Sequence, residues 1–133
     1  MHKHQDLQEA AEKAHIASWI ESLPQKYNTI CANRGQDLSV GQRQLITIAR
    51  AFARATPLVI LDEATASVDA LTEQWIDEAT SALFNDKTVL VIAHRLSTIA
   101  KADRILLLEK GSLVAQGSFE ELSDRLQGKV TQI

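Results

Sequence analysis

Two short, continuously apolar runs in the second half of the chain are separated by one amphipathic stretch. The runs predict strands at Leu58–Leu61 and Thr88–Ala93, and the stretch between them predicts a helix from about Ala70 to Phe84. Strands that are apolar at nearly every position are typical of parallel sheets covered on both faces. A strand, a helix and a second strand of this kind predict a parallel βαβ unit with a right-handed crossover, whose strands are buried on both faces.

Helical periodicity dominates the residues before the first strand. It predicts one helix over residues 6–21 that Pro24 ends, a polar loop over residues 25–37, and a second helix over residues 40–54. The second helix is predicted to have a buried stripe and an opposite, solvated face, formed by Leu45, Ile48, Ala49 and Phe52 and by Arg43, Arg50 and Arg54, respectively.

The end of the chain carries the signals of a hairpin and of a capped helix. The dipeptide Lys110-Gly111 separates two strand-like runs, Ile105–Glu109 and Ser112–Ala115, and the run Ser118–Glu121 has the spacing of a capping box. We therefore expect an α/β fold with a mostly parallel sheet flanked by helices and preceded by a helical segment. The predicted division is a helical segment over residues 1–56 and an α/β half-domain over residues 57–133.

Length and composition exclude several classes of protein. The 133 residues correspond to about one domain. A net charge of −3 without a clustered basic excess argues against a nucleic-acid partner. The single cysteine, Cys31, excludes an internal disulfide framework. No apolar run approaches the roughly 20 residues of a membrane helix, and no signal peptide is visible, so we expect no transmembrane segment.

The first predicted strand runs directly into two adjacent carboxylates, Asp62 and Glu63. Ligands of open α/β sheets usually bind at the carboxyl ends of strands. Successive side chains of a strand point to opposite faces, so one carboxylate can hold a metal while the other faces a nucleophile. In nucleotide hydrolysis a strand-end Asp holds Mg²⁺ and a neighbouring acid acts on the attacking water. The dipeptide by itself is more often a pair of solvated acids that begin a loop.

Two further features point to a phosphate ligand. Ser39 and Gln42 have the spacing of a capping box at the start of the second helix, and Gly41 leaves room for a ligand beside a helix amino end that attracts anions. His94 ends the second strand, on the sheet edge predicted for Glu63, where an imidazole can reach a γ-phosphate. Each feature taken singly is more often structural: a capped helix, or a histidine that caps or packs.

The order of these segments carries more information than any one of them. Leu38–Gln42, Leu58–Glu63, Ser67–Asp69 and Ala93–Thr98 resemble, in that order, the signature motif, Walker B strand, D-loop and H-loop of the ABC transporter nucleotide-binding domain. The residues in and around the signature and Walker B segments resemble the exporter branch of that family. The resemblance extends from about residue 7 to residue 122. It implies a partial P-loop NTPase-like fold with ATP and Mg²⁺ as ligands.

The resemblance also implies a role for each matching residue. Asp62 would hold the Mg²⁺ shell, Glu63 would be the general base, and His94 would contact the γ-phosphate. Asp69 would lie at the seam with a second nucleotide-binding domain. The signature would touch ATP bound to that opposite subunit, through the residues Ser39, Val40, Gly41 and Gln42.

The resemblance further implies partners and a location. The domain would pair with a second nucleotide-binding domain and with membrane-spanning domains, at the cytoplasmic face of the membrane. Arg34 and Gly35 fall in the loop that would face the membrane helices, although this loop lacks the acidic residue that exporters commonly carry there. Val40 replaces the first glycine of the signature, so we expect the backbone to approach a phosphate differently at that amide.

The chain lacks the Walker A loop, G-x-x-x-x-G-K-[ST], whose amides cradle phosphates. Only Gly128 precedes a lysine, and Ser123 and Val130 occupy other required positions. The resemblance is therefore to the carboxyl-terminal half of the domain. We predict that the chain alone hydrolyses ATP negligibly and that it self-associates through exposed sheet edge and apolar surface.

Two other functions stay open on the sequence. One is a lobe of a chromosome-maintenance or DNA-repair ATPase, which also joins a signature to a Walker B strand, although the long coiled coils of that class are not seen here. The other is a non-catalytic partner that only donates the signature to a second subunit. The presence of both Glu63 and His94 argues against a pure donor.

Overall fold

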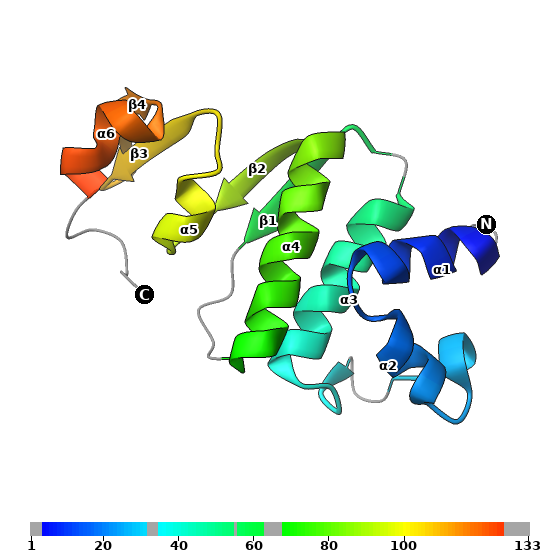
Figure 1. Cartoon of the computed structure of the whole chain (residues 1–133). Coiled ribbons are helices and arrows are strands. Elements are labelled where there is room, and N and C mark those ends of the chain that lie inside the picture. The colour runs from blue at the N-terminus through cyan, green and yellow to red at the C-terminus, as the bar shows by residue number, and fades with distance from the viewer. Residues whose placement is uncertain (1–3, 32–34, 55, 63–67, 127–133) are drawn as a thin grey trace. The chain divides into compact units, whose positions relative to one another are not determined.

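The computed structural model describes residues 4–31, 35–54, 56–62 and 68–126 (Figure 1). Helices and strands alternate from residue 40 to residue 109, which gives the predicted α/β class. The chain forms two compact units, residues 1–90 and 91–133, and each is described separately. The predicted division between residues 56 and 57 stays a prediction, and the helix that follows it packs along the helix that precedes it. None of the described helices is both long and apolar enough to cross a bilayer.

The first unit begins with two helices where one was predicted over residues 6–21. Helix α1 covers His4–Lys13 and α2 covers Ala17–Ser22. His15 between them has φ +55°, and the amides of His15 and Ile16 donate to the carbonyls of Glu12 and Ala11. These bonds form a Schellman-type helix end with His15 in the left-handed position that glycine usually occupies. The single long helix was therefore a wrong prediction, because this turn brings Ile16, only 2% exposed, into the core.

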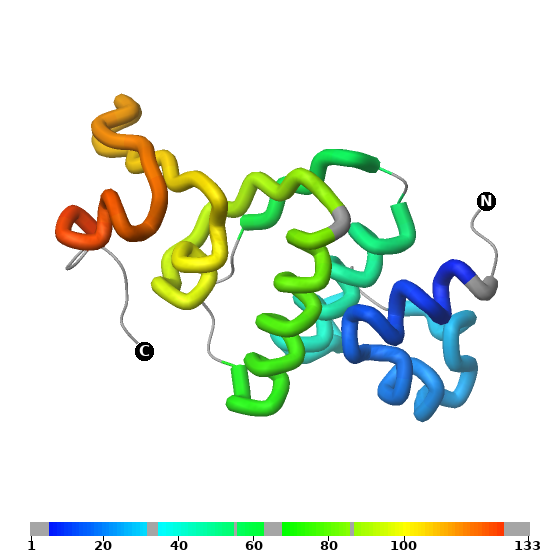
Figure 2. The backbone as a smooth tube through the Cα atoms, turned by 45° about the horizontal axis from the view of Figure 1, so that its top comes forward, coloured from blue at the N-terminus to red at the C-terminus, as the bar shows by residue number. Residues whose placement is uncertain are grey.

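Helix α3, Val40–Ala53, follows a short 3₁₀ helix at Lys26–Asn28 and is the central element of this unit. It packs against α1 and against α4, Ala70–Asp86, which runs beside it in both views (Figure 1 and Figure 2). The predicted stripe of α3 is confirmed, since two of its residues are buried and two are packed on the core. The core cluster consists of Ala11, Ala14, Ile16, Leu45, Ile48 and Ala79, with Ala49, Phe52, Trp19 and Trp75 packed against it.

Strands β1, Leu58–Asp62, and β2, Thr88–Ile92, pair in a two-stranded sheet, and their arrows run the same way in Figure 1. Helix α4 connects them, so the predicted parallel βαβ unit is present. The prediction that both faces are buried is wrong. Val59 is 9% exposed, but Leu58 and Ile60 are 53% and 64% exposed. Alternate side chains of a strand lie on opposite faces, and the described residues cover only one of them.

The second unit contains the predicted hairpin. Strand β3, Ile105–Glu109, pairs antiparallel with β4, Ser112–Gly117, and Lys110 and Gly111 in the turn have φ of 48° and 79°. Positive φ at both central residues is the geometry of a type I′ turn, which matches the twist of the strands. A bulge interrupts the register between Leu107 and Leu108.

A small core lies on one side of this hairpin. It combines a short helix that was not predicted, α5 at Leu96–Ile99, with α6 at Phe119–Leu126. The predicted capping box of α6 is confirmed, because the Ser118 amide donates to Glu121 Oε2 at 2.8 Å and the Glu121 amide donates to Ser118 Oγ at 3.3 Å. The buried cluster consists of Ile99, Ile105, Leu122 and Leu126.

Candidate functional site

The amino end of α3 holds the segment that resembles the signature motif. Ser39 is the N-cap residue: its Oγ accepts from the Gln42 amide at 3.1 Å, and its own amide donates to Gln42 Oε1 at 2.9 Å. The predicted capping box is therefore present. A hydroxyl that accepts one hydrogen bond still carries its own proton, so Ser39 can donate to an oxygen of an anion that binds at the amino end of the helix.

Gly41 is the second residue of α3 and is buried against α4. A Cβ at this position would overlap the methyl group of Thr72 and would lie 3.6 Å from Cγ1 of Val68. The sequence suggested that Gly41 leaves space for a ligand; the structure gives it the further task of letting α3 approach α4. Val40 is half-buried beside it, at the position where the signature usually has its first glycine.

Asp69 is the N-cap residue of α4. Its carboxylate accepts from the Thr72 hydroxyl at 2.6 Å and from the Thr72 amide at 3.0 Å. The bond from the Thr72 hydroxyl, followed by the bond from the Thr72 amide, lowers the pKa of Asp69 below the ordinary value of an aspartic acid. Thr72 thus contacts Gly41 with its methyl group and Asp69 with its hydroxyl, so the structure brings the predicted signature and D-loop residues of the first unit together.

Arg43 was not predicted to belong to this site. Its Nη1 donates to the carbonyl oxygens of Leu38 and Gly35 at 2.6 and 3.3 Å, in the turn immediately before Ser39. The arginine also lines a cavity of about 500 Å³ beside this turn, together with Ile46, Thr47 and Arg50. No sequence pattern marks such a bond, because its partners are backbone atoms five and eight residues earlier.

The structure describes only part of the predicted catalytic set. Asp62 is the last residue of β1 and is exposed, as predicted for a strand-end carboxylate. Glu63 lies outside the described residues, as does Arg34. His94 lies two residues after the end of β2, is exposed and belongs to the second unit. The predicted convergence of His94 with the acids therefore stays a prediction.

The donor set is compatible with Mg²⁺ shared with a nucleotide. The carboxylate of Asp62 makes no hydrogen bond or ion pair with another residue in the described ranges. Those ranges hold no cluster of three or more metal-ligating side chains. Mg²⁺ usually keeps several waters and takes one or two carboxylates plus phosphate oxygens rather than an all-protein cage. Asp62 fits that pattern.

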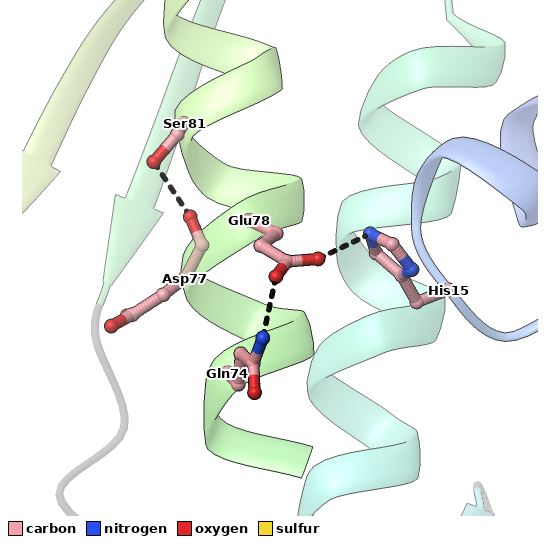
Figure 3. Close-up of polar contacts among 5 residues, drawn as sticks. All are labelled: His15, Gln74, Asp77, Glu78 and Ser81. Atoms are coloured by element: carbon pink, nitrogen blue, oxygen red, sulfur yellow. Dashed lines mark hydrogen bonds and ion pairs between the residues drawn. The ribbon is translucent and has the colours of Figure 1, made fainter. Parts of the chain in front are cut away.

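Polar side chains along α4 make one contact to the turn between α1 and α2 (Figure 3). Glu78 contacts His15 Nε2 with Oε2 at 3.2 Å and accepts from Gln74 Nε2 with Oε1 at 2.8 Å. The Ser81 hydroxyl donates to the Asp77 carbonyl at 2.7 Å. The contact links this turn to α4, and the partly exposed groups lie along the helix rather than at its amino end.

Comparisons with known proteins agree with this assembly of motifs. The family model described as ABC transporter matches residues 1–66. An ATP-dependent lipid A-core flippase of Haemophilus ducreyi is 50% identical over 113 residues, which are 85% of this chain and 19% of that protein. The heterocyst differentiation ATP-binding protein HepA of Nostoc is 44% identical over 125 residues, 94% of this chain and 20% of that protein.

A solved structure shows the same fold. A bacterial Atm1-family ABC exporter with ATP bound superposes with a TM-score of 0.79 at 42% identity, over 93% of this chain and 22% of that one. The chain thus spans about a fifth of the length of the relatives it matches. The solved structure is an ABC exporter, and none of these three names mentions chromosome maintenance or DNA repair. The chain belongs to the ABC transporter family and matches part of its nucleotide-binding domain.

Proposed function

We propose that the chain is part of an ATP-hydrolysing domain that powers an ABC-type membrane exporter. The domain would act at the cytoplasmic face of the membrane, with ATP and Mg²⁺, and would pair with a second nucleotide-binding domain and with membrane-spanning domains. The observation that carries the proposal is the junction of α3 and α4, where the signature-like segment at Ser39 and the D-loop-like Asp69 share Thr72 and Gly41 as a link.

Each site residue receives one role in this proposal. Asp62 would hold Mg²⁺, which supplies charge neutralisation at the phosphates when it is bound. Glu63 would orient and deprotonate the attacking water, and His94 would contact the γ-phosphate. Asp69 would lie at the dimer seam. The signature residues would contact ATP bound by the opposite subunit, through Ser39, Val40, Gly41 and Gln42.

The amino end of α3 supports the assignment to a phosphate. Helix α3 has 14 residues, and its amino end presents unpaired amides and a partial positive charge. The Ser39 hydroxyl adds a donor at the same place. The names of the two relatives contain the words ATP-dependent and ATP-binding. ATP carries phosphate groups, the chemistry that this helix end would bind.

A complementation experiment tests the proposal. The chain is mixed with a polypeptide that carries a Walker A loop, taken from the region that precedes the match in the lipid A-core flippase of Haemophilus ducreyi, and phosphate release from MgATP is measured. We expect hydrolysis by the mixture, negligible hydrolysis by the chain alone, and loss of activity with Glu63→Gln. The matched control is Glu9→Gln, an exposed carboxylate of α1 that pairs with Lys13. Activity that survives Glu63→Gln contradicts the proposal.

We also propose that the chain without such a partner associates with itself. Leu58 and Ile60 on β1 are more than half exposed, and the hairpin exposes a second apolar set of Leu106, Leu108, Leu113 and Val114. Exposed apolar side chains favour association in water. Sedimentation across a wide concentration range should show oligomers, and Ile60→Thr should shift them toward monomer. A monomer at every concentration contradicts the proposal.

A further inference from the structure

The guanidinium of Arg43 points backward along the chain, toward the turn that precedes α3. Its Nη1 lies 2.6 Å from the carbonyl oxygen of Leu38 and 3.3 Å from that of Gly35. The residue is exposed, as the sequence predicted, but exposure alone does not describe it. Nη1 of Arg43, a residue in the first turn of α3, thus donates to the carbonyls at both ends of the segment 35–38.

That segment is itself a closed turn. The Leu38 amide donates to the Gly35 carbonyl at 3.1 Å, and Gly35 is buried with φ +82°, a conformation that strongly favours glycine. The Gly35 carbonyl therefore accepts from Leu38 and from Arg43. The arginine joins this turn, residues 35–38, to the helix that begins directly after it.

Peptide geometry transmits this bond to Ser39. The carbonyl of Leu38 and the amide of Ser39 belong to one planar peptide group, so a donor that fixes the first also orients the second. The Ser39 amide donates to Gln42 Oε1, and the Ser39 carbonyl accepts from the Arg43 amide at 3.0 Å. Arg43 thus holds the peptide group before Ser39 with its side chain and the peptide group after it with its main chain.

We propose that Arg43 is a positioning residue: by bonding to the Gly35 and Leu38 carbonyls, it sets the orientation of Ser39 at the amino end of α3. The Ser39 hydroxyl is the donor assigned to the nucleotide, so this inference rests on the proposed function. Charge-assisted bonds from a planar guanidinium are directional, and Nη1 carries two N–H groups in fixed positions. A lysine ammonium can donate to the same carbonyls but has no fixed fork.

Hydrogen exchange of the chain itself tests the positioning. Arg43→Met keeps the aliphatic stem and removes the donors. We expect the Leu38 and Ser39 amides to exchange about tenfold faster in this variant, with little change at the Ile48 amide in the middle of α3. Arg43→Lys should restore a large part of the protection.

The control and the contrary results are specific. Arg50 lies on the same helix and lines the same cavity but makes no hydrogen bond from its side chain to another residue of the described ranges, so Arg50→Met should leave both amides unchanged. Exchange at Leu38 and Ser39 that stays within twofold of wild type overturns the proposal. Equal acceleration along all of α3 also overturns it, because the arginine would then only stabilise the helix.

The complementation mixture tests the effect on nucleotide. With Arg43→Met we expect the KM for ATP to rise about tenfold while kcat changes less than threefold, and we expect no further rise when the variant is combined with Ser39→Ala. If KM is unchanged, or if the effects of the two substitutions add, the claim that Arg43 acts on ATP binding by orienting Ser39 is overturned. If the mixture has no Glu63-dependent activity, the proposed function fails, whereas the exchange result still decides whether Arg43 positions the turn.

Discussion

The junction of α3 and α4 differs from the strand pair β1–β2 in how far its side chains find partners. These partners are hydrogen-bonding groups at the junction and covering apolar groups in the strands. At the junction, Ser39, Asp69 and Arg43 find hydrogen-bond partners within eight residues along the chain. In the strands, alternate apolar side chains such as Ile60 remain 64% exposed. The junction is therefore complete within the described residues, whereas one face of the strands requires a surface from elsewhere.

The largest change in the free energy of unfolding is expected where Gly41 of α3 meets Thr72 of α4. Gly→Ala inside a helix ordinarily stabilises a protein by about 1 kcal/mol. At Gly41 the added methyl overlaps Thr72, so we expect the opposite sign, a loss of about 2–3 kcal/mol in the free energy of unfolding. Urea denaturation followed by circular dichroism measures it.

A second substitution separates overlap from other causes. Thr72→Ser removes the methyl group that meets position 41 and keeps the hydroxyl that donates to Asp69. The pair Gly41→Ala with Thr72→Ser should therefore recover most of the stability that Gly41→Ala loses. A pair that is no more stable than Gly41→Ala would show that the helices do not meet at this contact.

The next effect contrasts the two faces of β1. Val59 is 9% exposed and Ile60 is 64% exposed, although they are neighbours in one strand. Val59→Ala should cost about 2 kcal/mol of unfolding free energy, and Ile60→Ala about 0.5 kcal/mol or less, measured at a concentration where the chain is monomeric. Similar losses at both positions would contradict a one-sided sheet.

The sequence predicted best what is decided within a few residues. The capping boxes at Ser39–Gln42 and Ser118–Glu121 and the Lys110-Gly111 turn follow from side chains and φ preferences that act locally. The break at His15 was missed, because a non-glycine residue takes the left-handed conformation there only to bury Ile16. Such a choice depends on the packing of distant residues.

The exposure of one face of the strands and the hydrogen bonds of Arg43 were missed for a related reason. A continuously apolar strand indicates what can be buried, but the covering surface decides what is buried, and Ile60 has none among the described residues. The carbonyls that Arg43 contacts carry no sequence signal at all. The link from Gly41 to Asp69 through Thr72 was not predicted, and the roles of Asp62, Glu63 and His94 stay predictions.

A smaller effect is expected where α3 ends and β1 begins. Lys87 Nζ donates to the carbonyls of Arg54 and Thr56, each at 2.8 Å, and so fixes the connection between the helix and the strand. Lys87→Met keeps the stem and removes both bonds, with an expected loss of about 1 kcal/mol of unfolding free energy. Arg104→Met, an exposed cation of the second unit, is the control and should change stability little. Equal losses in the two variants would argue against a specific role of Lys87.

The smallest effect concerns the dependence of stability on pH at the start of α4. The folded state lowers the pKa of Asp69 through the Thr72 hydroxyl and amide, so near pH 4 the unfolded chain binds more protons than the folded one and stability rises with pH. This contribution is complete above the unfolded pKa of about 3.9 and is lost as the pH falls through the lower folded pKa. Asp69→Asn still caps the helix but does not titrate, so the fall in the urea midpoint between pH 5 and pH 3 should become shallower, while Asp103→Asn should leave it as steep as in wild type. If Asp69→Asn leaves the fall in the urea midpoint between pH 5 and pH 3 unchanged, the bonds from Thr72 do not hold the carboxylate in its charged form. The junction is then stabilised by the packing of Gly41 against Thr72 rather than by the cap.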